Sequence, residues 1–465
     1  MVTRLFRLTV PLAISALILS ACSSDSSVEP SSLPLTPAPS LEVPDTDATQ
    51  SVISACETWD VEALEWRALP EPSDTEVRDS NGNTVSVSRS PLPPADAERY
   101  NVGVEVCPDI LLVIAHEGTS RYVSLEDWSW AEGPQFAPSG ETSRIAAAGV
   151  SSGGPTWGFR DGLLVDDALF LSDAVIDITT ECVRVDVHRV DLASVLEGSP
   201  ESDVILETTP CVSYTDQRRA ASAIRTHMGS ALAYDDVSDS LFVSIGDLHL
   251  GASTIGQAAG IGLEGTLLDY EILGNPSAMV GAVVAIENPH DLASSSVFAK
   301  GLRNSLGMAM SGGPLWLSDH GPAGGDELNA IEQGGNYGWP LTSTGRPYDR
   351  SAWPSSSSAL IAPWLDFQDA EVEGALAPLA TWTPAIAPTE MGVYPVDGPI
   401  VHYQGRMLLA TLRAQALHAL ELGSESITES TLGVGQRARN MTITGSGAVV
   451  LLTDSAELMM IEAAS

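Results

Sequence analysis

Four cysteines in the body of the chain offer the chemistry that is easiest to interpret. Cys56, Cys107, Cys182 and Cys211 form an even set, and no Cys-x-x-Cys pair occurs in the sequence. The absence of that pair argues against a dithiol redox motif or a cysteine zinc site. In an oxidising compartment, four thiols form two disulfides with three possible connectivities. We favour the pairing of sequence neighbours, Cys56 with Cys107 and Cys182 with Cys211.

The fifth cysteine, Cys22, stands at the end of an export signal. Two arginines precede a short apolar stretch, residues 8–19, and small residues lead to the cysteine. These features define a secretory signal, whereas a spanning helix would need about 18 or more apolar residues. Residues 19–22 (LSAC) are similar to the lipobox of bacterial lipoproteins. We therefore expect removal of residues 1–21 and an extracytoplasmic protein anchored by lipid on Cys22; the alternative is an ordinary signal peptide.

Residues 22–50 separate this signal from the rest of the chain. They consist mainly of Ser, Pro and acidic residues with few large apolar ones. A segment of this composition buries too little apolar surface to fold, so we expect a disordered, semi-extended tether. Residues 51–465 then form the folded region.

The charge balance narrows the range of partners. The chain has 22 basic and 61 acidic residues, a formal net charge of −39. A nucleic-acid partner is not expected, because its phosphates must be neutralised by Lys and Arg. The simplest role of the acidity is a well-solvated surface. Lys300 is the only lysine of the chain.

Short apolar runs that stop at Asp, His, Gly or Arg dominate the chain after residue 100. Runs of four to six residues bounded by turn formers are typical of strands. Six such runs recur, about 40 to 90 residues apart: ILLVIAHEG (110–118), ALFLSDAV (168–175), LFVSIGD (241–247), LWLSDHG (315–321), MLLATLR (407–413) and VVLLTDS (449–455).

This pattern indicates an all-β fold and favours a β-propeller. The closest runs are about 42 residues apart, near the length of one four-stranded blade, and the wider gaps leave room for insertions. A propeller packs its sheets around a central channel and exposes only short edges. A pair of β-sandwich domains is the alternative, since these also contain short strands at regular spacing.

Residues 301–340 carry a specific resemblance. The stretch GLRNSLGMAMSGGPLWLSDHGPAGGDELNAIEQGGNYGWP is similar to the soluble quinoprotein sugar dehydrogenases, the glucose/sorbosone dehydrogenase family. That family shows Arg-Asn-x-x-Gly, then His-Gly-Pro-x-Gly-Gly-Asp-Glu, then Gly-x-Asn-Tyr-Gly-Trp-Pro at this spacing. The likeness covers about residues 220–465 and is faint between 100 and 220. Its further matches, in the family's order, are residues 226–247, 381–394, 405–413 and 435–462.

The resemblance implies a six-bladed β-propeller that uses pyrroloquinoline quinone (PQQ) and calcium. Its implied reaction is the oxidation of a soluble aldose at the anomeric carbon. We therefore expect one six-bladed propeller over residues 51–465, preceded by the lipoprotein signal and the tether. The sequence identifies neither the sugar nor the electron acceptor.

The resemblance assigns proton abstraction to His227. A histidine with an ordinary pKa of about 6.5 suits that task at neutral pH. Asp247, which ends the next strand of the same blade, matches an active-site acid of the family. The alternatives are a histidine that caps a strand and an aspartate that forms a turn.

The second group of residues that the resemblance implies supplies positive charges for the cofactor, which is a flat tricarboxylate. Arginine suits this role because its planar fork binds carboxylates bidentately and stays charged. Arg303 and Asn304 match the family's pair over the quinone oxygens, and Arg413 matches a basic position. Arg437 and Arg439 match paired arginines, and their alternation on a strand places both on one face. Surface ion pairs are the alternative.

Calcium is the third implied group, and its ligands are oxygen atoms, backbone carbonyls included. The resemblance assigns carbonyl ligands to Gly321, Pro322 and Tyr337. Asp326 matches the acid beside the Gly-Pro turn, either as a ligand or as an orienting residue. The ion would polarise the quinone as a Lewis acid. A tight Gly-rich turn without an ion is the alternative.

Departures from the family pattern concern the substrate side. Leu302, Ser305 and Leu306 replace three positions of the usual His-Arg-Asn-Pro-Gln-Gly. Ala231 stands where an arginine is common, and Arg160 aligns loosely with a glutamine near the substrate. The main alternative function is a non-catalytic propeller that binds a carbohydrate or protein. A calcium-dependent propeller lactonase is a further one.

Overall fold

The computed structural model describes residues 55–93, 100–139, 157–177, 179–213, 227–248, 250, 272–291, 293–311, 313–322, 324–340, 343–344, 374–423 and 426–464. These residues all belong to one structural unit, Ala38–Ser465. The predicted signal (1–21), the tether (22–50) and the lipidation site Cys22 lie outside the described residues. No helix among the described residues is long and apolar enough to cross a membrane.

Each of the six apolar runs in the sequence forms the second strand of a separate antiparallel sheet. Their positions are buried on both faces, which explains why the runs are continuously apolar rather than alternating. The six strands are β5 (Ile110–Ala115), β9 (Ala168–Asp177), β14 (Ser240–Ile245), β18 (Leu315–Asp319), β22 (Met407–Thr411) and β26 (Val449–Thr453).

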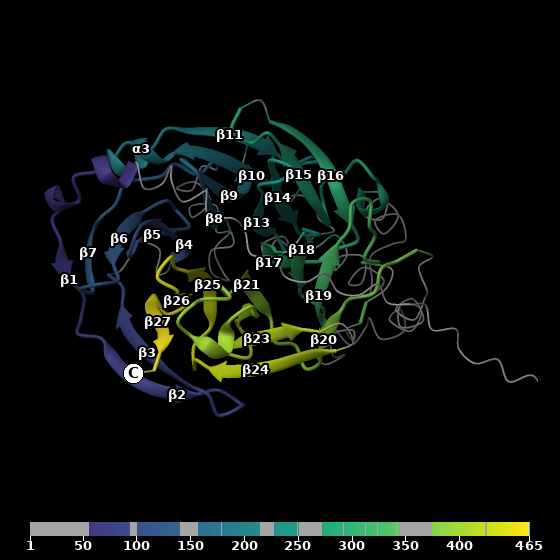
Figure 1. Ribbon diagram of the computed structural model, residues 1–465. Helices are drawn as coiled ribbons and strands as arrows, with labels where there is room; N and C mark the ends of the chain where they lie inside the picture. Colours follow the sequence, from purple (N-terminus) through teal and green to yellow (C-terminus); the bar gives the residue numbers. More distant parts are fainter. Residues whose placement is uncertain are drawn as a thin grey trace, which may run out of the picture. The chain divides into compact units, whose positions relative to one another are not determined.

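The first strand of each sheet lies at the centre of a closed ring (Figure 1). These inner strands are β4 (Tyr100–Cys107), β8 (Gly158–Val165), β13 (Gly229–Asp235), β17 (Ser305–Met310), β21 (Pro388–Val393) and β25 (Ala438–Ile443). Each inner strand contacts the next, and β25 contacts β4. The all-β, six-bladed β-propeller is therefore confirmed, and the alternative of two β-sandwich domains is wrong.

Further strands complete the blades on their outer side. Blade one adds β6 (Ser120–Ser124), β7 (Ser129–Glu132) and β1 (Arg67–Ala68), and blade two adds β10 (Cys182–Asp191), β11 (Ser202–Glu207) and β12 (Val212–Ser213). The next three blades add β15 (Ala282–Glu287) with β16 (Ser294–Lys300), β19 (Asp326–Ile331) with β20 (Ala380–Trp382), and β23 (Ala416–Leu422) with β24 (Ile427–Gly433). A short helix, α3 (Leu192–Leu196), and the 3-10 turn η5 (Val401–Tyr403) lie between strands, and the 3-10 turn η2 (Val61–Ala63) precedes β1.

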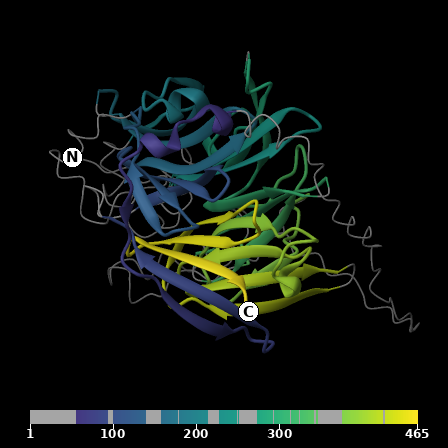
Figure 2. The same ribbon diagram turned by 60° about the vertical axis from the view of Figure 1, so that its left-hand side comes forward.

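The sixth blade combines the two ends of the described chain. β27 (Glu457–Ala463) pairs with β3 (Thr84–Pro91), which in turn pairs with β2 (Ser73–Arg78). The register runs from Glu457 opposite Pro91 to Ala463 opposite Val85. Figure 2 shows the yellow strands of the C-terminal region beside the dark blue strands of the N-terminal region. Backbone hydrogen bonds between distant parts of the sequence therefore close the ring.

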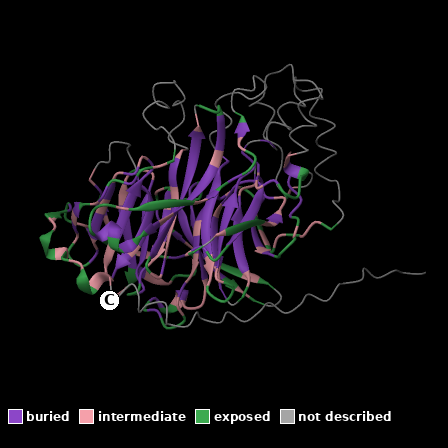
Figure 3. Cartoon of the chain, turned by 90° about the horizontal axis from the view of Figure 1, so that it is seen from above, coloured by how far each residue is buried: buried purple, intermediate pink, exposed green. Residues whose placement is uncertain are grey.

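Burial and disulfides hold the blades together. The strands are buried over most of their length, and exposed residues concentrate at turns and at outer strands (Figure 3). One disulfide joins Cys56 to Cys107, at the end of β4, and the other joins Cys182 to Cys211. The predicted pairing of sequence neighbours is confirmed.

Candidate active site

The topology gathers the predicted site residues on one face of the propeller. All six inner strands begin at this face, and the second strands end there because each pair is antiparallel. His227 lies just before β13, and Asp247 lies just after β14 of the same blade. Arg303 and Asn304 directly precede β17 in the next blade. Residues far apart in the sequence therefore meet at neighbouring strand ends.

His227 and Asp247 form a buried hydrogen-bonded pair. Nδ1 of His227 lies 2.8 Å from Oδ1 of Asp247, and the two residues are 5% and 0% exposed. The turn after β14 that carries Asp247 is held against His227 by the backbone N–H of Leu248, which donates to the His227 carbonyl at 3.1 Å. A Cβ at Gly246 would lie 2.1 Å from that same carbonyl oxygen, so the turn that positions Asp247 requires glycine.

Arg303 contacts the other ring nitrogen of His227. Its Nη2 lies 3.0 Å from His227 Nε2, and its Nη1 donates to the carbonyls of His320 (3.0 Å) and Gly321 (3.2 Å). Because a guanidinium can only donate, Nε2 must be the unprotonated nitrogen and Nδ1 must carry the hydrogen. Asp247 therefore accepts the Nδ1–H, and a lone pair remains on Nε2.

The surroundings of His227 keep its imidazole neutral. Burial is the largest cause, and the charges of Arg303 and His320 add to it; together they hold the pKa of His227 well below the ordinary value of 6.5. At neutral pH this histidine is ready to accept a proton. The geometry and the charge state agree with the role that the resemblance assigns to it.

Trp339 completes the cluster, and the sequence analysis did not single it out. Its indole Nε1 donates to Oδ2 of Asp247 at 2.8 Å, so both carboxylate oxygens of Asp247 are engaged. The guanidinium carbon of Arg303 lies 5.4 Å from the centre of the indole ring, a cation–π distance. The only signal for Trp339 in the sequence was its membership of the Gly-Asn-Tyr-Gly-Trp-Pro motif.

A second buried acid, Asp319, fixes the strand start that carries Arg303. Its two oxygens accept the backbone N–H of Arg303 (2.9 Å) and of Asn304 (2.6 Å), and the hydroxyl of Ser305 donates at 3.1 Å. Ser305, a departure from the family pattern, therefore supports this anchor. Burial raises the pKa of the Asp319 carboxyl. The aspartate was overlooked because, among 61 acids, nothing in its type or spacing marks it.

Asn304 and His320 link this strand start to its neighbours. Asn304 Oδ1 accepts from the backbone N–H of Gly229 (3.2 Å), and its Nδ2 lies 3.4 Å from Nδ1 of His320. His320 Nε2 contacts the carbonyl of Pro388 at 2.5 Å, which makes Nε2 the protonated nitrogen. Asn304 therefore lies within the same network as Arg303, and His320 is a further residue that sequence reasoning missed.

The turn predicted to offer calcium ligands is rigid. The carboxylate of Asp326 accepts three backbone N–H groups, from Gly321 (3.0 Å), Ile386 (2.7 Å) and Ala387 (2.6 Å). Of the two roles predicted for Asp326, these contacts fit the orienting one. The Gly321 carbonyl faces Arg303, and Pro322 is buried beside it.

Tyr337, the third predicted calcium ligand, uses its side chain elsewhere. Its hydroxyl donates to the carbonyl of Ala330 at 2.6 Å and accepts from the N–H of Glu332. Among the described residues no hydrogen bond joins it to the Gly321–Pro322 turn, and no cluster of three or more His, Cys, Asp or Glu could hold a metal. An ion at this turn would depend on backbone carbonyls.

The remaining predicted cations lie at other strand ends of the same face. Arg437 and Arg439 both contact Asp454, which follows β26: Arg437 Nε lies 2.7 Å from Oδ2, and Arg439 Nη2 lies 2.7 Å from Oδ1. Arg413 follows β22 and its side chain is exposed. The described hydrogen bonds do not connect these three arginines with His227. The structure brings Arg437 and Arg439 together and leaves Arg413 apart.

The fold and site define a six-bladed propeller with a buried His–Asp–Arg cluster at the ends of its inner strands. The chain belongs to the glucose/sorbosone dehydrogenase family, whose sequence profile matches residues 213–461. The matched region contains all residues of the cluster. The family resemblance found in the sequence is therefore confirmed.

Individual proteins support this assignment. The chain is 31% identical over 243 residues to an uncharacterised protein of Synechocystis, covering 49% of this chain and 53% of that protein. It is 30% identical over 176 residues to the aldose sugar dehydrogenase YliI of Escherichia coli, covering 36% and 44% of the two chains. The chain thus spans about half the length of the curated relatives it matches.

Solved structures share the fold. The apo form of the soluble aldose sugar dehydrogenase of Escherichia coli superposes with a TM-score of 0.59 at 19% identity, over 81% of this chain and 100% of that one. The PQQ-bound aldose sugar dehydrogenase of Streptomyces coelicolor superposes with a TM-score of 0.50 at 17% identity, over 85% and 99%.

Proposed function

We propose that this protein is a PQQ- and calcium-dependent dehydrogenase that oxidises an aldose at the anomeric carbon outside the cytoplasmic membrane. The observation that carries the proposal is the unprotonated Nε2 of His227, held by Asp247 and facing Arg303. Membership of the glucose/sorbosone dehydrogenase family supports it. The PQQ-bound relative from Streptomyces coelicolor supports the choice of cofactor.

The chemistry of the donor groups fits PQQ. A tricarboxylate needs fixed cations, and Arg303, Arg413, Arg437 and Arg439 all lie at strand ends of the face that carries His227. Arginine binds carboxylates bidentately and keeps its charge. Arg303 and Asn304 would hold the quinone side, and the other arginines would hold carboxylates. When bound, PQQ supplies the acceptor for the hydride that leaves the anomeric carbon.

The protein's own groups handle the proton. Nε2 of His227 takes the proton of the anomeric hydroxyl, and Asp247 stabilises the imidazolium that forms, because it already accepts the Nδ1–H. Arg303 gives up its contact with Nε2 as the hydroxyl arrives. Trp339 holds the second oxygen of Asp247 and keeps water away from it. A base positioned in this way typically contributes about a hundred- to ten-thousand-fold in rate.

Calcium would bind at the Gly321–Pro322 turn, through carbonyl oxygens that Asp326 holds in place. Calcium accepts such oxygens, including those of the backbone. At this position, beside Arg303, the ion would add positive charge next to the quinone. Because the ion would lie beside the cofactor, binding of calcium and binding of PQQ are tested in one experiment.

The deciding experiment adds PQQ and calcium to the purified apo-protein. We expect cofactor absorbance to saturate and aldoses to drive reduction of an artificial dye, and we expect His227→Ala to retain cofactor binding but lose turnover. Failure of the wild-type protein to bind PQQ with calcium, or to oxidise any aldose, would contradict the proposal. A propeller that only binds a carbohydrate or protein would then take its place.

The lipid anchor is part of the proposal and has its own test. Residues 19–22 match a lipobox, so Cys22→Ala should release the protein from membranes or block its maturation. Cell fractionation and mass spectrometry of the mature N-terminus decide the matter. A mature N-terminus elsewhere, with an unmodified Cys22, would refute the anchor.

The acidic and amide residues of the inner strands bear on the lactonase alternative. Such an enzyme needs inward acids and asparagines around an ion, and the inner strands do carry Asp161, Glu390 and Asn440. However, the carboxyls of Asp161 and Glu390 are hydrogen-bonded to each other across opposite blades. Two carboxyls in such contact share a proton, so a cation at this position would have to displace that proton.

A further inference from the structure

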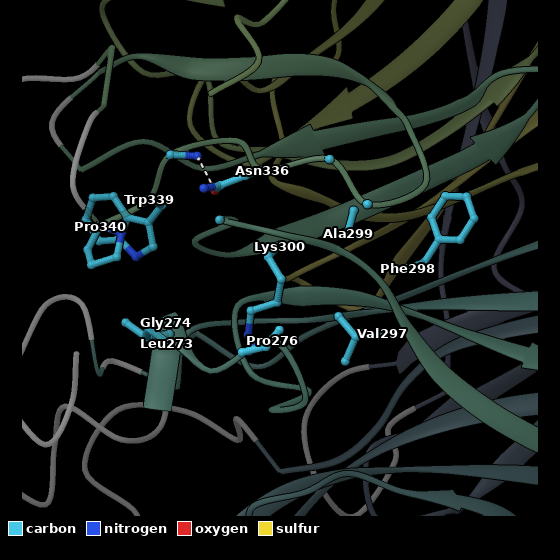
Figure 4. A pocket seen from close by; sticks show the side chains of 14 residues that line it. Leu273, Gly274, Pro276, Val297, Phe298, Ala299, Lys300, Asn336, Trp339 and Pro340 are labelled. Carbon is cyan, nitrogen blue, oxygen red and sulfur yellow. Dashed lines mark hydrogen bonds between the residues drawn. The ribbon is translucent and has the colours of Figure 1, made fainter. Parts of the chain in front are cut away.

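Lys300, the only lysine of the chain, lines a pocket beside the active site. It ends β16, and the pocket has a volume of about 370 Å³. Figure 4 shows the Lys300 side chain between Trp339 and Pro340 on one side and the segment around Pro276 on the other. The pocket therefore lies between the outer strand of one blade and the Gly334–Pro340 segment of the next.

The charge of Lys300 has no acidic partner in the described part of the chain. Its Nζ donates to the carbonyls of Ala278 (2.7 Å) and Val280 (2.8 Å). A lysine ammonium has three N–H donors, and among the described residues the third meets neither an acceptor nor a carboxylate. This is notable in a chain with 61 acidic residues, whose described arginines pair with acids at many positions.

Burial disfavours the charged form of the Lys300 amine. It lowers the pKa of Lys300 to about 8. A carboxylate placed against Nζ would favour the charged form and reverse that effect. The pocket therefore offers a negatively charged group a hydrogen-bond donor that is desolvated and held in place on two sides.

The walls of the pocket suit a sugar. An indole ring and a proline form one wall, and an aromatic face packs well against the C–H groups of a sugar ring. Several lining positions lack side chains, which leaves space for a sugar ring between the walls, while their N–H groups at Gly334, Gly335 and Gly338 already donate within the protein. The lining positions without side chains are Gly274, Gly301, Gly334, Gly335 and Gly338.

Hydrogen bonds of Trp339 connect the pocket with the His227 cluster. The backbone N–H of Trp339 donates to the carbonyl of Gly301 at 3.0 Å, two residues from Arg303. The indole of Trp339 donates to Asp247. Trp339 thus belongs both to the wall of the pocket and to the proton-accepting site, which places any occupant of the pocket next to that site.

We propose that this pocket binds an acidic sugar, an aldonate or a uronate, whose carboxylate contacts Lys300. The choice of a sugar rests on the proposed function, whereas the carboxylate follows from Lys300 itself. An aldonate is the hydrolysed product of aldose oxidation, and a uronate is an aldose that carries its own carboxylate. Both present the same charge to the amine.

Nuclear magnetic resonance of the apo-protein tests the proposal without turnover. Incorporation of [ε-¹³C]lysine gives a single resonance, because the chain has one lysine. D-gluconate and D-glucuronate are titrated separately, with D-glucose as the neutral control. We expect a saturable shift of the resonance with at least one acid and no shift with glucose; the two acid titrations tell an aldonate site from a uronate site.

Calorimetry of Lys300→Met and Lys300→Arg gives a second measurement. Loss of a charge-assisted hydrogen bond should weaken binding of the acid about tenfold or more in Lys300→Met, and Lys300→Arg should restore part of it. Both variants are first compared with the wild type by thermal unfolding, and the wild-type titration decides the matter if a variant does not fold.

The proposal is wrong if neither acid shifts the lysine resonance, if glucose shifts it equally, or if Lys300→Met binds the acid as tightly as the wild type. These outcomes are independent of the proposed enzyme activity. A protein that binds gluconate but oxidises no aldose would keep this inference and lose the proposed function. A protein that oxidises aldoses without perturbing Lys300 would do the reverse.

Discussion

Nη2 of Arg303 lies 3.0 Å from Nε2 of His227, so the unprotonated nitrogen of this histidine faces a permanent cation. A proton on Nε2 would point at the guanidinium of Arg303, and the positive charge of the guanidinium would repel it. Asp247, on the opposite side of the ring, accepts the other ring hydrogen. The histidine is therefore set to its neutral form and to one tautomer before any substrate arrives.

Removal of His227 should separate chemistry from cofactor binding. We expect His227→Ala to lower kcat about a hundred- to ten-thousand-fold, and PQQ affinity to change little, because the arginines remain. Steady-state kinetics and absorbance titration with PQQ measure the two effects. Excess PQQ should not rescue this variant, and a full rescue would show that His227 binds the cofactor instead.

The acid side of the pH profile should report the neutral histidine. The pKa of His227 lies well below 6.5, and the neutral form is the active one, so kcat/KM should fall only as the pH drops below that value. In Arg303→Gln, which removes the second cause of the lowered pKa, this acid limb should move to higher pH. An acid limb at or above pH 6.5 in the wild type would contradict the assignment.

The fold could be predicted largely because strands buried on both faces leave a continuous apolar signal. All six second strands were recognised on that ground, whereas the number of blades was implied by the family resemblance. The outermost strand of the sixth blade, β2, could not be recognised, because SDTEVR is polar and almost wholly exposed. Its pairing depends on backbone hydrogen bonds, which leave no trace in side-chain pattern.

The site was predictable only where a motif marked it. His227 and Arg303 are separated in the sequence by the whole of the third blade, and no local pattern indicates that their nitrogens meet. Trp339 and His320 lay inside recognised motifs, but their contacts depend on how neighbouring strand ends converge. The pairing of Asp161 with Glu390 was beyond the sequence, because they come from opposite blades and resemble any other acids of the chain.

Charge at the arginine pair should control cofactor affinity in both directions. Asp454 is shared by Arg437 and Arg439, so it offsets part of their positive charge. We expect Arg439→Ala to weaken PQQ binding about ten- to a hundredfold and Asp454→Asn to strengthen it. Titration with PQQ in the presence of calcium gives both dissociation constants.

Arg406 provides the matched control for this pair. It also pairs with an acid, Glu421, at 3.0 Å, but it precedes β22 and therefore lies at the opposite face. Arg406→Ala should leave PQQ affinity unchanged. If Arg439→Ala behaves like Arg406→Ala, or if Asp454→Asn weakens binding, the arginine pair does not hold the cofactor.

The carboxyl pair in the channel should make stability fall as the pH rises. Burial raises the pKa of Asp161 to about 6 and that of Glu390 well above its ordinary value of 4.5. The folded state thus holds protons more tightly than the unfolded state. The contribution of the pair is complete below the ordinary values and is lost as the pH rises through the raised ones.

Glu390→Gln should reduce this pH dependence, because an amide cannot ionise and can still donate to Asp161. Urea unfolding between pH 4.5 and about 7.5 measures the slope of the unfolding free energy. Glu421→Gln, at a carboxylate that is 62% exposed, is the control and should keep the wild-type slope. An unchanged slope in Glu390→Gln would show that the pair does not share a proton in the folded protein.

The two disulfides should leave no free thiol in the mature fold. Titration of the denatured, unreduced protein should therefore give a value near zero. Cys211→Ser opens one link and should lower the free energy of unfolding by about 2–5 kcal/mol. Denaturant unfolding with and without reductant checks this cost, and two or more titratable thiols in the wild type would show that the pairing is incomplete.

The pairing of β3 with β27 sets an order of events for a chain that is synthesised from its N-terminus. Strand β3 emerges from the ribosome hundreds of residues before its partner, so the ring cannot close while the chain is still being synthesised. A chain cut short before residue 457 would leave β3 as an open edge, ready to associate with other chains or to be cleaved by proteases. A protease that recognises an open strand edge can therefore distinguish a finished chain from an unfinished one by β3 alone.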